Sequence, residues 1–269
     1  MKHKYPFTNA IVFSLVMRDP CRCRGLLKTI FSDRKIRDVR LHKDYADAEH
    51  TIIAGIESRK VRLVVLFADD ESWYDIELQV RDEHDLPKRT RYAHACLDVR
   101  ELKAGDGFNE LKPSYVIFLC CFDYFNLDKP LYRFELFDSK NGLPLQDETY
   151  TIILNSRSSE ADMPPALKEL FGYMNEETVP ENNAFLQDLD HSVEEWNTGE
   201  KVNIIMTLEQ EILIKEARAR EDGIKEERQR NEQENAARIR RMHDDSLPVD
   251  TIAEYMGCTP EQVKAVLGL

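Results

Sequence analysis

Two neighbouring runs with strand-like spacing constrain the fold of this chain more than any other feature. The runs are residues 61–68 and 72–80, and a short acidic turn between them has hairpin length. In the second run Asp75, Glu77 and Gln79 are spaced two apart, so they share one face of a strand while apolar residues occupy the other. The pattern predicts an antiparallel strand pair with acidic groups on one face.

The rest of the chain predicts a mixed sheet between helices, which is an α/β fold. Helices are expected at residues 8–31 (two short helices interrupted at Asp19-Pro20), 86–103, 164–175, 180–198 and 203–242, and strands at 50–57, 61–68, 72–80, 114–122, 132–137 and 149–154. The continuous apolar run at 114–122 is typical of a central strand covered on both faces, and the last two strands are expected at sheet edges.

The helix at 86–103 has an apolar spacing that predicts its orientation. Tyr92, Cys96, Val99 and Leu102 recur at helical intervals and are expected to line one face of this helix.

Composition limits the classes of function. The 269 residues are 42% apolar, which is enough for one core with appendages, and no apolar run reaches the length of a membrane span. The formal net charge of −13 argues against broad electrostatic capture of nucleic acid, although a local basic groove stays open. None of the six cysteines forms a CxxC pair, so reduced thiols and a cytoplasmic location are expected.

The acidic strand face suggests a metal site. A glutamate on a buried strand needs a partner, and Mg²⁺ prefers carboxylate and water oxygens. Glu77 is therefore the candidate metal ligand, with Asp75 as a possible second ligand, and Gln79 can hold a water through its amide. The alternative is that Asp75, Glu77 and Gln79 form the solvent-exposed face of an ordinary antiparallel sheet.

A basic stretch opens the helix that follows this strand. Lys88 and Arg91 are three residues apart and share a helix face, where they can hold phosphates with Tyr92 beside them. The alternative is a solvated first turn, which is an awkward position for cations because the helix N-terminus is itself positive.

These motifs occur in the order of a known family. The matching segments are Leu63-Val64-Val65, Tyr74-Asp75-Ile76-Glu77-Leu78-Gln79, Lys88-Arg89-Thr90-Arg91-Tyr92, Tyr115-Val116-Ile117-Phe118, Phe122-Asp123-Tyr124-Phe125 and Ile153-Leu154-Asn155, with Asn9 and Phe13 in the first helix. The chain resembles the Rpn family of recombination-promoting nucleases, also described as PD-(D/E)xK nuclease family transposases, over residues 5–160. Its charged helix and small terminal unit also resemble the usual tail of that family.

The resemblance implies a restriction-endonuclease-like core and Mg²⁺-dependent cleavage of DNA. Carried over by position, Glu77 is the metal ligand, Gln79 orients the water, and Lys88, Arg89, Arg91 and Tyr92 face DNA phosphate. A homodimer is also implied, because such nucleases often use two active sites for two strands.

The sequence departs from the family pattern at Val64. The resemblance implies a metal-binding aspartate there, and valine offers no oxygen. Because a bound metal contributes several kcal/mol to phosphodiester cleavage, we expect impaired activity. Asp75, on the same strand as Glu77, and Glu57, at the end of the preceding strand, are the carboxylates that could replace the missing aspartate.

Four segments are expected along the chain. They are a nuclease-like core at 1–160, a helical extension at 161–202, a long charged helix or linker at 203–242 and a small helix-turn-helix-like unit at 243–269. The terminal unit fits either DNA readout or packing and oligomerisation.

Three functions follow from this sequence. The first is a Mg²⁺-dependent DNA endonuclease impaired by Val64. The second is a catalytically inactive nuclease fold that binds DNA or protein, and the third is a helical adaptor that acts through residues 163–269.

Overall fold

The computed structural model describes residues 3–32, 34–36, 38–41, 64–68, 72–176 and 178–269. These residues form two compact units, Met1–Glu211 and Ile212–Leu269. The predicted strand at 50–57 and the first three residues of the predicted strand at 61–68 lie outside the described residues.

Two groups of three strands follow one another along the described parts of the chain, with helices before, between and after them. The elements are α1 (Ala10–Val16), α2 (Pro20–Ile30), β1 (Arg40–Leu41), β2 (Val64–Ala68), β3 (Trp73–Gln79), α4 (Leu86–Glu101), a short 3₁₀ turn η2 (Phe108–Glu110), β4 (Ser114–Cys120), β5 (Leu131–Phe134), β6 (Thr149–Asn155), α5 (Pro165–Glu176), α6 (Ala184–Trp196), α7 (Lys201–Asp244), α8 (Val249–Met256) and α9 (Pro260–Leu267).

The strands form one mixed sheet in the order β1-β2-β3-β4-β6-β5. β3 and β6 run parallel to β4, and the other pairs are antiparallel, including the predicted β2–β3 pair. β4 is a central strand, buried along its whole length, as its apolar run predicts. β6 lies inside the sheet between β4 and β5, so the prediction that it is an edge strand was wrong. Its buried second half, Ile152–Asn155, explains why an interior place suits it.

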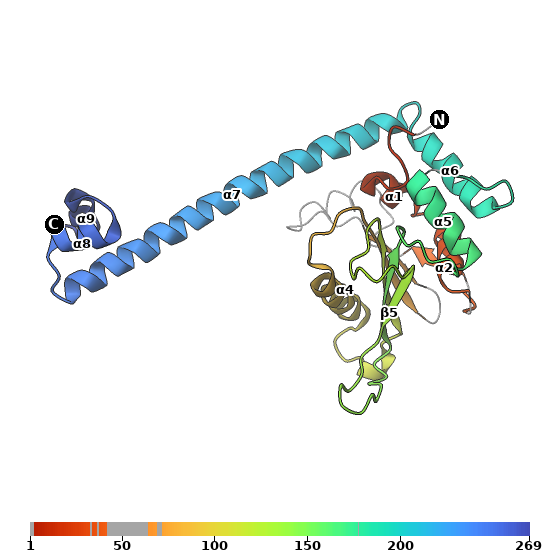
Figure 1. Ribbon diagram of the computed structural model, residues 1–269, viewed down its shortest axis with the longest axis horizontal. Helices are drawn as coiled ribbons and strands as arrows, with labels where there is room; N and C mark the ends of the chain where they lie inside the picture. Colours follow the sequence, from red (N-terminus) through yellow and green to blue (C-terminus); the bar gives the residue numbers. More distant parts are fainter. Residues whose placement is uncertain (1–2, 33, 37, 42–63, 69–71, 177) are drawn as a thin grey trace. The chain divides into compact units, whose positions relative to one another are not determined.

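Helices cover both faces of this sheet (Figure 1). α4 packs on one face, where Leu86, Ala93 and Leu97 contact Val116 and Phe118 of β4. The other face is covered by the N-terminal helices together with α5 and α6. Mixed sheets with helices on both faces bury their strands fully, which places the acidic residues of β3 inside the fold.

A row of tyrosines crosses the second face. Tyr74, Tyr115 and Tyr150 stack in succession, with ring centroids 5.4 and 4.7 Å apart. Arg133 lies 5.0 Å from the ring of Tyr150, and Arg34 donates to the hydroxyl of Tyr115. Since the three strands are in register at these residues, the aromatic row fixes their relative alignment.

The first two helices begin as the sequence predicts. Asn9 caps α1 by accepting from the backbone N–H groups of Ile11 and Val12, and Asp19 caps α2 with Pro20 in its first turn. α2 then approaches α6 closely at Gly25, where a Cβ would lie 2.4 Å from the ring of Phe185. A side chain at this position would push the two helices apart.

The orientation predicted for α4 was wrong. Its buried residues are Leu86, Thr90, Ala93 and Leu97, while Tyr92 and Val99 are exposed. The buried face combines two leucines with Thr90 and Ala93, and these two small residues carry little apolar signal in the sequence.

The unit Ile212–Leu269 has a small core of its own. Ile239 near the end of α7 packs with Ile252 of α8 and Val263 of α9. Thr259 and Gln262 form a reciprocal capping box at the start of α9, and Gly257 ends α8 with a φ of +63°, a conformation that favours glycine. α8 and α9 are thus two short helices joined by a turn at Gly257–Thr259.

The helix α7 contains 44 residues, most of them charged or polar. Ion pairs four residues apart, such as Lys225 with Glu221 at 2.9 Å, support it. Among the described helices, α7 included, none is both long enough and apolar enough to cross a membrane.

Candidate active site

The candidate site forms where β3 faces the first turns of α4. The Arg89 Nη2 atom donates to Glu77 Oε2 at 2.8 Å, and Nη1 donates to Gln79 Oε1 at 3.3 Å. One guanidinium therefore holds the side chains of both residues of the Glu-x-Gln pair. Its carbon also lies 6.0 Å from the ring of Phe118 on β4, at the cation–π limit.

The acidic residues of β3 are buried. Asp75 is 3% exposed and Glu77 is 2% exposed. The alternative that these residues form a solvent-exposed sheet face was therefore wrong for both. A buried carboxylate needs a compensating charge or hydrogen bonds, and Arg89 supplies both to Glu77.

The strand register places Val64 directly opposite Glu77 and Leu66 opposite Asp75. In an antiparallel pair, residues directly opposite each other lie on the same face of the sheet. Position 64 is thus the position on β2 that the strand register pairs with Glu77. Neither valine nor leucine supplies an oxygen ligand there.

The described part of β2 supplies no carboxylate for a Mg²⁺ site beside Glu77. Within the described ranges, no group of three or more His, Cys, Asp and Glu side chains is arranged to hold a metal. The Glu77 carboxylate faces the Arg89 guanidinium at 2.8 Å, where a metal would meet a like charge. Cys120 pairs with Gln79 across the sheet, and burial raises the pKa of its thiol far above the usual range.

The three other predicted DNA contacts lie on the outside of α4. Lys88 and Arg91 are exposed, and Tyr92 is 63% exposed. Arg89 is the exception in this basic stretch, since its side chain turns inward to Glu77 and is only 20% exposed. The structure therefore separates the stretch into an inner cation and an outer cationic surface.

Sequence reasoning missed the role of Arg89. The spacing gave Lys88, Arg89 and Arg91 the same chemistry, and only the rotation of α4 decides which of them meets β3. One signal was available, because a cation in the first turn of a helix opposes the helix dipole and so calls for an anionic partner.

The fold and this site define a class of protein. A mixed sheet with helices on both faces carries a buried Glu-x-Gln beside an arginine from the next helix, with a hairpin partner strand opposite the glutamate. Residues 24–244 match the PD-(D/E)XK nuclease family transposases, and the chain belongs to this family. No curated protein and no solved structure matches this sequence.

Proposed function

We propose that this chain is a DNA-binding member of the nuclease family whose own cleavage activity is impaired. One observation carries the proposal: Glu77 is neutralised by Arg89 while Val64 stands opposite it in the register. The site thus has one of the two expected carboxylates, and a protein cation already compensates its charge. Family membership supports a nuclease-like function, and the altered site supports the impairment.

The outer surface of α4 supports the DNA-binding part. Lys88 and Arg91 are exposed on the helix that carries Arg89, so phosphate held there lies beside the candidate active site. A few phosphate contacts give weak binding that falls with salt. This local surface is compatible with the net charge of −13, because the excess acid need not lie at the contact.

The cleavage experiment compares supercoiled plasmid nicking in Mg²⁺ by the unaltered chain, Val64→Asp and Val64→Asn. We expect little nicking by the unaltered chain, and an increase of about 100-fold or more in Val64→Asp, because a metal site contributes several kcal/mol. Asparagine has the same shape without the charge and should not restore cleavage. Adding Glu77→Ala to Val64→Asp should abolish the gain.

Two other outcomes would change the conclusion. Mg²⁺-dependent cleavage by the unaltered chain that Glu77→Ala removes would show a working site, and the impairment would be wrong. DNA binding without cleavage in every variant would favour the second function, a nuclease fold kept only for binding.

DNA binding is tested by an electrophoretic mobility shift assay on duplex DNA at several salt concentrations. The double variant Lys88→Ala/Arg91→Ala should weaken binding about tenfold and reduce its salt dependence by about two phosphate contacts. Lys168→Ala is the matched control, since this exposed lysine lies on α5. If the double variant and Lys168→Ala bound DNA equally well, the DNA-binding surface would not lie on α4.

The proposal also includes a homodimer and a cytoplasmic location. Two copies would place one site on each DNA strand, and the six cysteines are all free thiols, as suits a reducing compartment. Sedimentation equilibrium of the full chain, with and without DNA, tests the dimer.

A further inference from the structure

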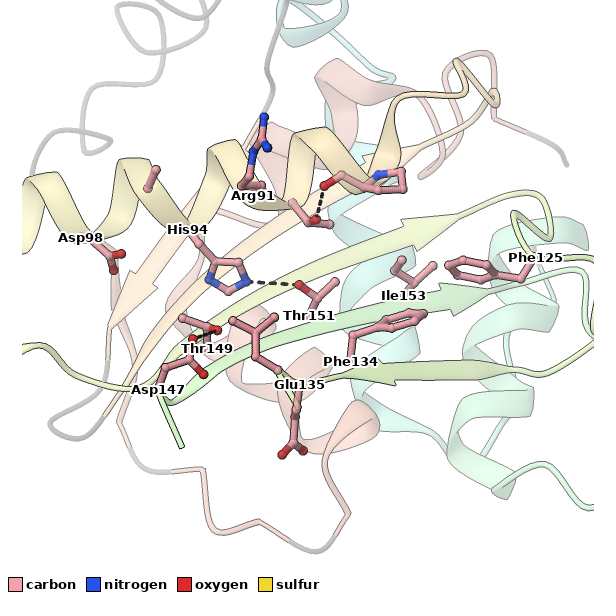
Figure 2. Close-up of a pocket in the computed structure, with 14 residues that line it drawn as sticks. Arg91, His94, Asp98, Phe125, Phe134, Glu135, Asp147, Thr149, Thr151 and Ile153 are labelled. Carbon is pink, nitrogen blue, oxygen red and sulfur yellow. Dashed lines mark hydrogen bonds between the residues drawn. The ribbon is translucent and has the colours of Figure 1, made fainter. Parts of the chain in front are cut away.

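A pocket of about 600 Å³ lies between α4 and the β6–β5 half of the sheet (Figure 2). It opens on the same sheet face as Glu77, but its lining residues come from the other side of α4 and do not include Glu77, Gln79 or Arg89. The volume is within the range of small-ligand sites.

One end of this pocket is apolar. Phe125, Phe134 and Ile153 line it, and the rings of Phe125 and Phe134 are 5.2 Å apart at their centroids. Figure 2 shows these three side chains together, at the end of the pocket away from Asp98. Phe134 is 43% exposed although it is a large aromatic residue, so part of this wall faces solvent.

The other end is acidic. Asp98 and Asp147 lie there, and the pKa of Asp98 is raised by burial and then by the charges of Glu101 and Asp147. Asp147 accepts a hydrogen bond from the Thr149 hydroxyl at 2.6 Å. Among the residues that the structure describes, no hydrogen bond or ion pair is made by the Asp98 carboxylate.

Two described arginines lie near the pocket. Arg91 lines it, but in Figure 2 its side chain extends away from His94, and Arg133 is paired with Glu135 at 2.8 Å. Glu135 itself points away from the acidic end in the same view.

His94 supplies no positive charge to this end of the pocket. Its Nδ1 lies 2.8 Å from the Ser114 hydroxyl and its Nε2 lies 3.1 Å from the Thr151 hydroxyl, so both ring nitrogens are engaged. Burial lowers its pKa to about 4, against a smaller opposing effect of Asp147, and the ring is neutral near pH 7.

We propose that this pocket binds a small organic cation with an apolar or aromatic body. The ammonium or guanidinium group lies between Asp98 and Asp147, and the apolar body packs against Phe134, Phe125 and Ile153. The cation relieves the repulsion between two carboxylates, and the body covers the exposed part of the aromatic wall. This site is separate from the Glu77 site and does not depend on cleavage.

The experiment uses three probes with the same phenyl body and different charge: phenethylamine, 2-phenylethanol and phenylacetate. Binding to the full chain is measured at pH 7.5 by ligand-observed NMR titration. We expect a Kd of about 1 mM or below for phenethylamine, binding at least about tenfold weaker for the alcohol, and no binding of phenylacetate.

Variants assign the binding to this pocket. Asp98→Asn and Phe134→Ala should each weaken phenethylamine binding about tenfold, and both positions are partly exposed, so the fold should tolerate them. Asp162→Asn is the matched control, an exposed carboxylate outside the pocket, and should leave the Kd unchanged.

Four results would overturn the proposal. Equal affinity for the amine and the alcohol would show apolar binding without charge recognition. An unchanged Kd in Asp98→Asn, or no binding of phenethylamine by the unaltered chain, would remove the acidic end from the site. Competition by Mg²⁺ alone at the same affinity would make the acidic end a metal site instead.

Discussion

Glu77 and Arg89 illustrate how one contact can settle the chemistry of a site. Burying a carboxylate to 2% exposure is costly without a compensating charge or hydrogen bond, and the Arg89 guanidinium supplies both. The pair also holds Gln79 in place, since the same guanidinium bonds its amide oxygen. The charge balance of the site is therefore built into the described fold.

The first prediction concerns the stability that this pair contributes. Arg89→Met keeps much of the side-chain volume and removes the charge, and we expect it to lower the free energy of unfolding by about 3 kcal/mol, because breaking a buried pair leaves the other charge uncompensated. Lys88→Met, on the exposed side of the same turn, should change it by less than about 0.5 kcal/mol. Urea unfolding followed by circular dichroism measures both.

The double variant Glu77→Gln/Arg89→Met measures the interaction free energy between Glu77 and Arg89. Its loss should be clearly smaller than the sum of the two single losses, since neither partner is then left alone. Additive losses would show that Glu77 and Arg89 act independently.

The second prediction concerns His94 and pH. Its pKa falls from 6.5 to about 4 in the folded chain, so the unfolded chain binds the proton first as pH decreases. The free energy of unfolding should therefore fall from about pH 6.5 down to about pH 4, by about 3 kcal/mol in total from this group. His94→Gln can still bond Ser114 and Thr151 but cannot titrate.

Urea unfolding at a series of pH values from 4 to 7.5 tests this in both proteins. As pH decreases, the free energy of unfolding should fall more steeply in the unaltered chain than in His94→Gln. Parallel pH profiles would show that His94 is not held neutral by its surroundings.

At the scale of elements, the hairpin was the most predictable part. The strand-like runs at 61–68 and 72–80 and the short turn between them predicted the β2–β3 pair, and the apolar run at 114–122 predicted the central strand. Alternation along 72–80 placed Glu77 and Gln79 on one strand face, whereas the interest of Val64 came from the family resemblance, and the register pairs it with Glu77. Which residues of a strand share a face is a local property, and the periodicity of the sequence predicts it well.

Properties that depend on packing between elements were not predictable in the same way. The buried face of α4 is lined partly by Thr90 and Ala93, which carry little hydrophobic signal. The pocket joins Asp98, Phe134 and Asp147, which are far apart in the sequence and meet only because β6 lies beside β4. No spacing rule connects such residues.

The third prediction tests the corrected face of α4. Leu97 is 4% exposed in the cluster with Phe118, whereas Val99 is 80% exposed. Leu97→Ala should lower the free energy of unfolding by about 3 kcal/mol through lost burial and a cavity. Val99→Ala should change it by less than about 0.5 kcal/mol. A larger loss of stability in Val99→Ala than in Leu97→Ala, measured by urea unfolding, would support the buried face predicted from the sequence.

At the scale of the whole molecule, each compact unit has its own core. The unit Met1–Glu211 is built on the sheet, and the unit Ile212–Leu269 on Ile239, Ile252 and Val263. Units with separate cores can open separately, and their local stabilities need not agree.

The fourth prediction follows from this separation. Ile252→Ala should speed amide hydrogen exchange throughout α8 and α9 and leave exchange in β3, β4 and β6 unchanged, because the lost contacts belong to one unit. Tyr255→Ala is the control, since that side chain is exposed. Faster exchange in the sheet strands after Ile252→Ala would show that the units unfold together. Mass spectrometry of peptide fragments measures both variants.

The positions of the two tryptophans have a practical consequence. Trp73 begins β3 and packs against the cluster under α4, and Trp196 ends α6 with the Lys201 ammonium 5.3 Å from its ring. Residues 212–269 contain no tryptophan. Indole emission therefore reports on the sheet-containing unit alone, and Trp196→Phe leaves a single tryptophan, on the strand that carries Glu77.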